Sequence, residues 1–320
     1  MARVISTNLR SFPQRLLVAW ALVALVAASS SAAFAAAAAR ERTFATPEAG
    51  VEALVAATRA DSTRGLVQIL GTEGRKLVFS GDPIADKEGR GRFVAAYDKA
   101  HKIVTEGDAR AVLEIGEENW PMPIPLVKEA SAWRFDTKAA EREILARRIG
   151  RNELGAIEVC RAYVVAQQEY ASSDRLGHGL REYAARFISS AGKHDGLYWP
   201  AEAGGEESPL GPLVASARAE GYGPKGKAGG KRAPYHGYYY KILTRQGKDA
   251  PGGAYGYVVK GHLIGGFALV AYPAQYRNSG VMTFMVNQDG VVYQKDLGAG
   301  TAKLAPAMTA FNPDKSWTKQ

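Results

Sequence analysis

The chain has 320 residues, a formal net charge of +9 and a single cysteine. Hydrophobic residues make up 46% and charged residues 23% of the sequence, which is typical of a folded globular protein and excludes a disordered one. One cysteine excludes an intrachain disulfide, so stability must come from packed hydrophobic cores.

The first 39 residues have the pattern of a secretory signal peptide. Three arginines precede the apolar run Leu16–Ala28, and small residues end at Ala33-Phe34-Ala35. The run is shorter than the roughly 20 residues of a membrane span, so an uncleaved anchor is the less favoured alternative. We therefore expect a periplasmic or secreted bacterial protein with no transmembrane segment after cleavage, which excludes ATP-dependent and cytosolic redox roles. Removing three positive charges leaves the mature chain at +6.

Residues 40–137 predict an N-terminal α+β domain. Thr46 and Pro47 are favourable residues for starting a helix, and a second short helix ends near Leu70. A third helix is expected to continue as far as Ile103. The mostly apolar segment at 111–115 and the alternating segment at 132–136 predict strands of a small curved antiparallel sheet.

The order of these elements resembles the cone-shaped nuclear-transport-factor-like fold. The resemblance rests on the opening Thr46-Pro47-Glu48 helix and on the Trp133-x-Phe135-Asp136 strand, and it covers residues 44–137. It implies a pocket at the mouth of the cone. Trp120 and Trp133 are possible walls of that pocket, although core packing is the favoured role for both.

Residues 138–320 predict a second α+β unit. Apolar residues from Thr137 to Ser172 recur at helical spacing, and a short helix is expected at 181–189. A Gly/Pro/Lys-rich loop is expected at 192–234. Five strands of an antiparallel meander should follow, at 238–243, 255–259, 267–272, 282–287 and 291–294. Gln288-Asp289-Gly290 predicts a tight hairpin turn between the last two strands.

This half resembles the globular domain of pilins and pseudopilins. The resemblance is carried by the helix segment from Ile157 to Ala171 and by the strand segments at 237–240, 267–273 and 280–291. It implies a long helix packed on an antiparallel sheet. The helix here is internal and lacks the apolar N-terminal stem of a prepilin, so polymerisation does not follow from the resemblance.

Taken whole, residues 44–317 resemble the uncharacterised bacterial family catalogued as domain of unknown function 2950 (DUF2950). The resemblance implies no activity and no catalytic residues. It is carried by five segments: Ser80–Pro83, Trp120–Val127, Asp195–Pro200, Gly265–Ala271 and Val286–Val291.

No convergent catalytic, cofactor or metal motif is found, so none is predicted. The segment from Gly221 to Ala228 approximates a phosphate-binding loop but lacks the preceding strand and the hydroxyl beside Lys227. Asp174 and Glu182 are too few carboxylates for calcium, and the five histidines have no metal-ligand spacing. The pair His194 and Asp195 is the one basis for an alternative, an unrecognised hydrolase.

Interaction through the C-terminal half is therefore the leading hypothesis. In a strand, Tyr238 and Tyr240 share one face, and tyrosines on an exposed face suit contact with proteins or sugars. Buried cross-strand pairs in the core are the alternative for these tyrosines. The predicted interaction residues are Tyr238, Tyr240, Tyr198, Trp199, Lys225, Lys227, Lys231 and Arg232. The expected function is a non-catalytic envelope protein that binds another protein or an anionic cell-wall polymer, with no role in nucleic-acid binding. A small or polymeric ligand held in an N-terminal cone pocket is the alternative.

We expect export with cleavage after Ala35 or Ala39, because both follow small residues at the end of the apolar run. Intact-mass measurement of protein recovered from the periplasm tests this. A mass that retains the Leu16–Ala28 segment would show a membrane-tethered form instead.

Overall fold

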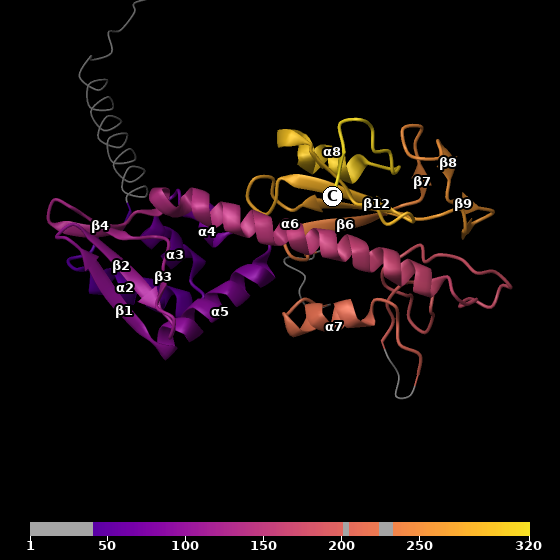
Figure 1. Ribbon diagram of the computed structural model, residues 1–320. Coiled ribbons are helices and arrows are strands. Elements are labelled where there is room, and N and C mark those ends of the chain that lie inside the picture. Colours follow the sequence, from indigo (N-terminus) through magenta and orange to yellow (C-terminus); the bar gives the residue numbers. More distant parts are fainter. Residues whose placement is uncertain (1–40, 201–204, 224–232) are drawn as a thin grey trace, which may run out of the picture.

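The computed structural model describes residues 41–200, 205–223 and 233–320. It forms two lobes along one continuous helix, α6 (Thr137–Tyr170), which runs from the N-terminal lobe to the far end of the C-terminal lobe (Figure 1). Each lobe combines helices with an antiparallel sheet, so the α+β class predicted from the sequence is confirmed. Among the described helices, none is both long enough and apolar enough to cross a bilayer.

Four helices precede the sheet of the N-terminal lobe: α2 (Pro47–Arg59), α3 (Thr63–Leu70), α4 (Arg75–Val78) and α5 (Pro83–Lys99). The strands are β1 (His101–Glu106), β2 (Arg110–Ile115), β3 (Trp120–Pro121), β4 (Leu126–Glu129) and β5 (Ala132–Phe135). They are ordered β1-β2-β4-β5, and β3 pairs with β2. The Thr46 hydroxyl accepts the Ala49 amide, as expected for the N-cap of α2.

The third helix ends earlier than the sequence pattern predicted. Residues 101–106 form β1, and Ile103 lies opposite Leu113 on β2. Ala100 ends α5 in an extended conformation, so pairing with β2 outweighs the local helical spacing. Trp120 is 57% exposed and contributes no core packing, whereas Trp133 is buried in the N-terminal core.

Helix α6 takes part in both hydrophobic cores. Its first turns place Ala140 in the core of the N-terminal lobe, and its second half places Cys160 and Tyr163 in the core of the C-terminal lobe. The helix continues through Gly150 and Gly155 because tertiary packing on both sides offsets their low helix propensity.

The C-terminal sheet has the order β14-β13-β12-β11-β6. Its strands are β6 (Tyr238–Leu243), β11 (Ala268–Pro273), β12 (Met282–Asn287), β13 (Tyr293–Asp296) and β14 (Thr318–Lys319). The predicted hairpin turn joins β12 to β13, and Gly290 takes the positive φ of 75° that such a turn requires.

Smaller elements surround this sheet (Figure 1). They are α7 (Gly211–Ala219), α8 (Thr301–Ala307), the 3-10 helix η2 (Gly298–Gly300), and the ribbons β7 (Arg245–Gln246) with β8 (Tyr255–Gly256) and β9 (Val258–Val259) with β10 (His262–Leu263).

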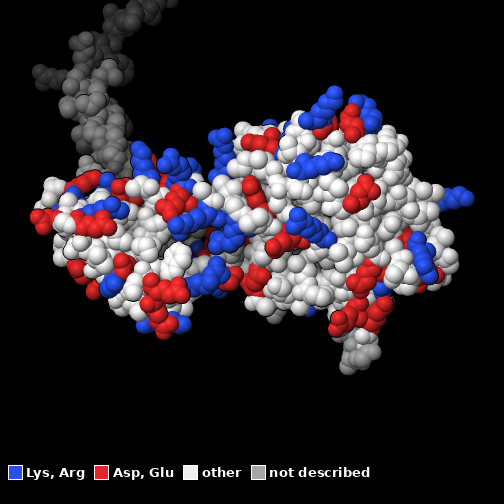
Figure 2. Space-filling model, viewed as in Figure 1, with Lys and Arg blue, Asp and Glu red and all other residues white. Residues whose placement is uncertain are grey.

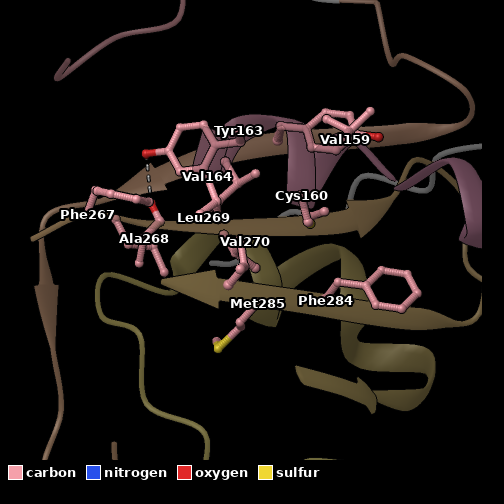
Figure 3. Close-up of a cluster of buried hydrophobic side chains, with 14 of the residues drawn as sticks. Val159, Cys160, Tyr163, Val164, Phe267, Ala268, Leu269, Val270, Phe284 and Met285 are labelled. Atoms are coloured by element: carbon pink, nitrogen blue, oxygen red, sulfur yellow. Dashed lines mark hydrogen bonds between the residues drawn. The ribbon is translucent and has the colours of Figure 1, made fainter. Parts of the chain in front are cut away.

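The packing of α6 on β11 and β12 fixes the C-terminal lobe (Figure 3). Cys160 and Tyr163 are almost fully buried, and the Tyr163 hydroxyl donates to the Ala268 carbonyl at 3.4 Å. Burial raises the pKa of the Cys160 thiol to about 12. Cys160 is therefore an inert core residue rather than a nucleophile.

Three other expectations for the C-terminal half are wrong. Residues 255–259 are not a strand of the five-stranded sheet, because 255–256 pair with β7 and 258–259 pair with β10. Residues 181–189 form no helix, because their backbone bonds elsewhere: the Tyr183 amide donates to the Leu263 carbonyl and the Ser189 amide to the Tyr198 carbonyl. The segment 192–234 is not merely a loop, since it contains α7 and places Leu197 and Leu210 in the core. Residues 201–204 and 224–232 of that segment lie outside the described residues.

Candidate functional site

The predicted interaction residues do not form an exposed aromatic face. Tyr238 and Tyr240 are both buried, and the Tyr238 hydroxyl donates to the Met282 carbonyl at 2.9 Å. The expectation that they face solvent is wrong, because α6 covers the side of the sheet on which both rings lie. Trp199 is also buried, and its indole N–H donates to the Glu206 carbonyl.

The remaining predicted residues divide into two groups. Tyr198 is half-buried, with the Arg218 guanidinium 5.1 Å from its ring centroid. The four basic residues lie outside the described part of the chain: Lys225, Lys227, Lys231 and Arg232.

His194 and Asp195 do not form a catalytic pair. The His194 ring stacks on Trp199 with ring centroids 4.2 Å apart. The Asp195 carboxylate accepts the Ser190 amide at 2.7 Å and the Ser190 hydroxyl at 2.9 Å. Although the two residues are adjacent in the sequence, His194 contacts Trp199 and Asp195 contacts Ser190.

A cavity of about 360 Å³ lies where the helices of the N-terminal lobe meet α6; we call it the junction pocket. Its volume falls in the range of small-molecule sites, roughly 300–1,000 Å³. Most of its walls are apolar side chains from α2, α3, α5, α6 and the segment before β4: Leu54, Leu66, Leu70, Phe93, Met122, Ile124 and Ile144. Such walls suit the hydrocarbon part of a ligand.

Four arginines also line the junction pocket: Arg90, Arg92, Arg148 and Arg151. Basic side chains, with acidic ones beside them, are prominent at the waist between the lobes in the space-filling view (Figure 2). Arg90 and Arg92 are each paired with a carboxylate, Asp61 and Glu88. Arg151 is exposed and forms no ion pair within the described residues. The pocket lining therefore combines these arginines with apolar side chains.

Arg148 is the most constrained of the four. Its guanidinium donates to the carbonyls of Lys76 and Leu77 at 2.9 and 2.8 Å and to Asn278 Oδ1 at 2.7 Å. All three partners are neutral acceptors, so its positive charge is not cancelled by a hydrogen-bonded carboxylate. Burial lowers the pKa of Arg148, and the nearby Asp86 opposes this shift. A desolvated guanidinium with neutral partners favours an anionic ligand group nearby.

The two acids that line the pocket are occupied by backbone donors. The Asp86 carboxylate accepts the Ser80 amide with both oxygens, at 3.0 and 3.3 Å. Burial raises the pKa of Asp86, against the lowering effect of the Ser80 hydrogen bonds.

Asp82 connects the two lobes. Its Oδ1 accepts the Ile84 and Ala85 amides and so caps α5. Its Oδ2 accepts the Tyr222 hydroxyl at 2.7 Å and the Gly237 amide at 3.0 Å, both from the C-terminal half. Burial, with the Asp82 charge, raises the pKa of Tyr222, so its hydroxyl remains a donor. A carboxylate with four donors is stable when buried.

Gly237 fits this site because of its backbone. Its φ is 74°, and a Cβ at this position would lie 2.5 Å from Asn152 Nδ2. A side chain here would therefore strain the backbone and displace the Asn152 amide, which donates to the Ser279 carbonyl.

Asn278 forms a second connection between the lobes. Its amide nitrogen donates to the Phe79 carbonyl at 2.7 Å, while its oxygen accepts from Arg148. The wall of the junction pocket that includes Arg148 is thus held from both lobes.

Only part of this site could be predicted from the sequence. The turn at Ser80–Pro83 has the signature of a helix N-cap. The partners of Asp82 in the C-terminal half, Tyr222 and Gly237, are 140 and 155 residues away along the chain, so no local pattern indicated them. Helical spacing likewise does not show which polar positions of α6, such as Arg148, meet a second lobe.

A family model described as a protein of unknown function (DUF2950) matches residues 41–320, which confirms the resemblance seen in the sequence. No curated protein and no solved structure matches the chain.

We expect Asp82→Ala to lower the free energy of unfolding by about 3 kcal/mol or more, because it removes a cap and leaves buried donors without an acceptor. Thr46→Ala removes a helix cap that makes no contact between lobes, so it should cost about 1 kcal/mol. Urea unfolding followed by circular dichroism measures both. Equal costs for the two variants would show that Asp82 acts only as a cap.

Proposed function

The chain belongs to the family described as protein of unknown function (DUF2950), and we propose that it is an exported binding protein that holds an amphipathic anion in the junction pocket. The ligand would have an apolar body and a carboxylate or phosphate head. The observation that carries the proposal is the Arg148 guanidinium, partly desolvated and bonded to neutral acceptors at the edge of an apolar cavity.

The lining of the pocket matches both parts of such a ligand, the hydrocarbon chain and the anionic head. Burying a hydrocarbon chain against residues such as Leu66, Phe93 and Ile144 releases water from apolar surface, at about 25 cal/mol per Å². The head would be attracted by Arg148 and, nearer to solvent, by Arg151.

Export is supported by the N-terminal pattern of basic, apolar and small residues. The family match begins at residue 41, directly after the two expected cleavage points. An envelope location would place the pocket close to membrane lipids and their breakdown products, which include amphipathic anions.

The function that the sequence favoured, contact with a partner through the C-terminal sheet, loses the support of its buried aromatic residues. Tyr238, Tyr240 and Trp199 are buried and cannot touch a partner without unfolding the core. The half-buried Tyr198 remains available, but one aromatic ring does not make an interface.

Filling the pocket tests the proposal. Gly89 lines the cavity on α5, and a Cβ there meets only Arg92, at 3.9 Å, so Gly89→Leu can be accommodated. Gly91→Leu is the matched control: this glycine is on the same helix, is exposed, and has no atom within 4 Å of its added Cβ. We expect Gly89→Leu to weaken binding of the fluorescent probe dansylaminoundecanoate by about tenfold or more, and Gly91→Leu to leave it unchanged.

Charge is tested separately from volume. Arg151→Gln removes a guanidinium at the pocket, whereas Arg147→Gln removes one that is a turn away on α6 and paired with Glu143. Only Arg151→Gln should weaken the displacement of the probe by dodecanoate. Neither variant should change the displacement of the probe by dodecanol, which has no charge. Protection of the Cys160 thiol from a thiol reagent verifies that each variant is folded. Equal probe affinity in the wild type and in Gly89→Leu would overturn the proposal.

A further inference from the structure

Two potential metal ligands four residues apart, His178 and Glu182, meet a third, His262, from 80 positions further along the chain. His178, Glu182 and His262 each offer one ligand atom, and these atoms all lie within 4.8 Å of one another. His262 Nδ1 is 3.2 Å from each oxygen of Glu182, and His178 Nδ1 is 3.7 Å from Glu182 Oε1. We call these three residues the His–Glu–His cluster.

The backbone around the cluster is held in place independently of the three side chains. The Asp174 carboxylate accepts the amides of His178 and Gly179, which shapes the loop that carries His178. The Tyr183 amide donates to the Leu263 carbonyl at 2.8 Å, which ties the segment of Glu182 to strand β10, where His262 lies. The cluster is thus built by tertiary structure rather than by chance contact of mobile side chains.

Glu182 is the central member of the cluster. Its side chain is only 10% exposed, and within the described residues its ion-pair partners are the two imidazoles. A buried carboxylate requires a positive partner or several donors. A divalent cation bound by all three side chains would meet this requirement.

We propose that the His–Glu–His cluster binds a zinc ion. Imidazole nitrogens and a carboxylate are common zinc ligands, with bonds of about 2.0–2.2 Å. Donor atoms in a tetrahedral site lie roughly 3.4 Å apart, so the exposed His178 side chain must move inward by about an ångström. Three protein ligands leave the fourth position to water, on the side where His178 faces solvent.

The ring orientation suits a shared ion. His178 and His262 have centroids 5.7 Å apart and an interplanar angle of 75°, so they are not stacked on each other. Two imidazoles that bind one metal must direct their nitrogens toward a common point. This site is separate from the junction pocket, and the proposal does not depend on the proposed function.

Zinc titration of the tag-free mature protein, after treatment with a chelator, tests the proposal. A chromophoric zinc indicator should report one tightly held ion per chain, and bound Co²⁺ should give the intense visible absorption of a four-coordinate site. Ca²⁺ should not compete, since it favours sites with six or more oxygens.

The variants His178→Ala, Glu182→Gln and His262→Ala identify the ligands. Even the loss of a hydrogen-bond partner behind a ligand costs roughly 10–100-fold in affinity, so loss of a ligand should cost at least as much. His101→Ala is the control, because His101 stacks on Tyr97 in the other lobe and should not affect zinc. His178 is exposed, so His178→Ala is a usable variant even if His262→Ala does not fold.

Absence of zinc uptake by the folded wild type would overturn the proposal. Uptake that is unchanged in folded His178→Ala and Glu182→Gln would also overturn it, because the three residues would then be an ordinary ion-pair cluster.

Discussion

The buried carboxylate of Asp82 is the interaction on which the relation between the two lobes depends. One carboxylate oxygen caps the N-terminus of α5. The other accepts hydrogen bonds from the Tyr222 hydroxyl and the Gly237 amide, both from the opposite half of the chain. Because each lobe has its own hydrophobic core, apolar packing inside the lobes does not by itself fix how they sit against each other. The continuous helix α6 and the donors around Asp82 and Asn278 supply that constraint.

The junction pocket follows from this arrangement. Helix α5 begins at its N-cap, Asp82, and forms one wall of the pocket. Helix α6 passes from one lobe to the other and contributes Arg148 to the lining of the cavity. The pocket is thus built from elements of the N-terminal lobe, but Arg148 is held in place by Asn278 of the C-terminal lobe. Ligand affinity and the stability of the junction should therefore change together when Asn278 or Asp82 is altered.

Local sequence patterns predicted the elements that have a regular hydrophobic period or a characteristic turn motif. The helix beginning at Thr137, strand β6 and the hairpin turn at Gly290 have clear periodicity or turn chemistry, and all are present. The strand at 101–106 was missed because only its pairing with β2 distinguishes it from a continuing helix. Tyr238 and Tyr240 were placed on one face correctly, but only the position of α6 shows that this face is covered. Both candidate ligand sites depend on contacts between residues that are distant in the sequence. Glu182 and His262, for example, are 80 positions apart.

If the space between α5 and α6 holds an amphipathic anion, a crystal structure of the mature protein with dodecanoate should show the bound ligand. We expect continuous density for the hydrocarbon chain between Phe93 and Ile144, with the carboxylate directed toward Arg148 or Arg151. A ligand that lies on another surface, or a junction pocket that stays empty at saturating ligand, would rule out this binding site.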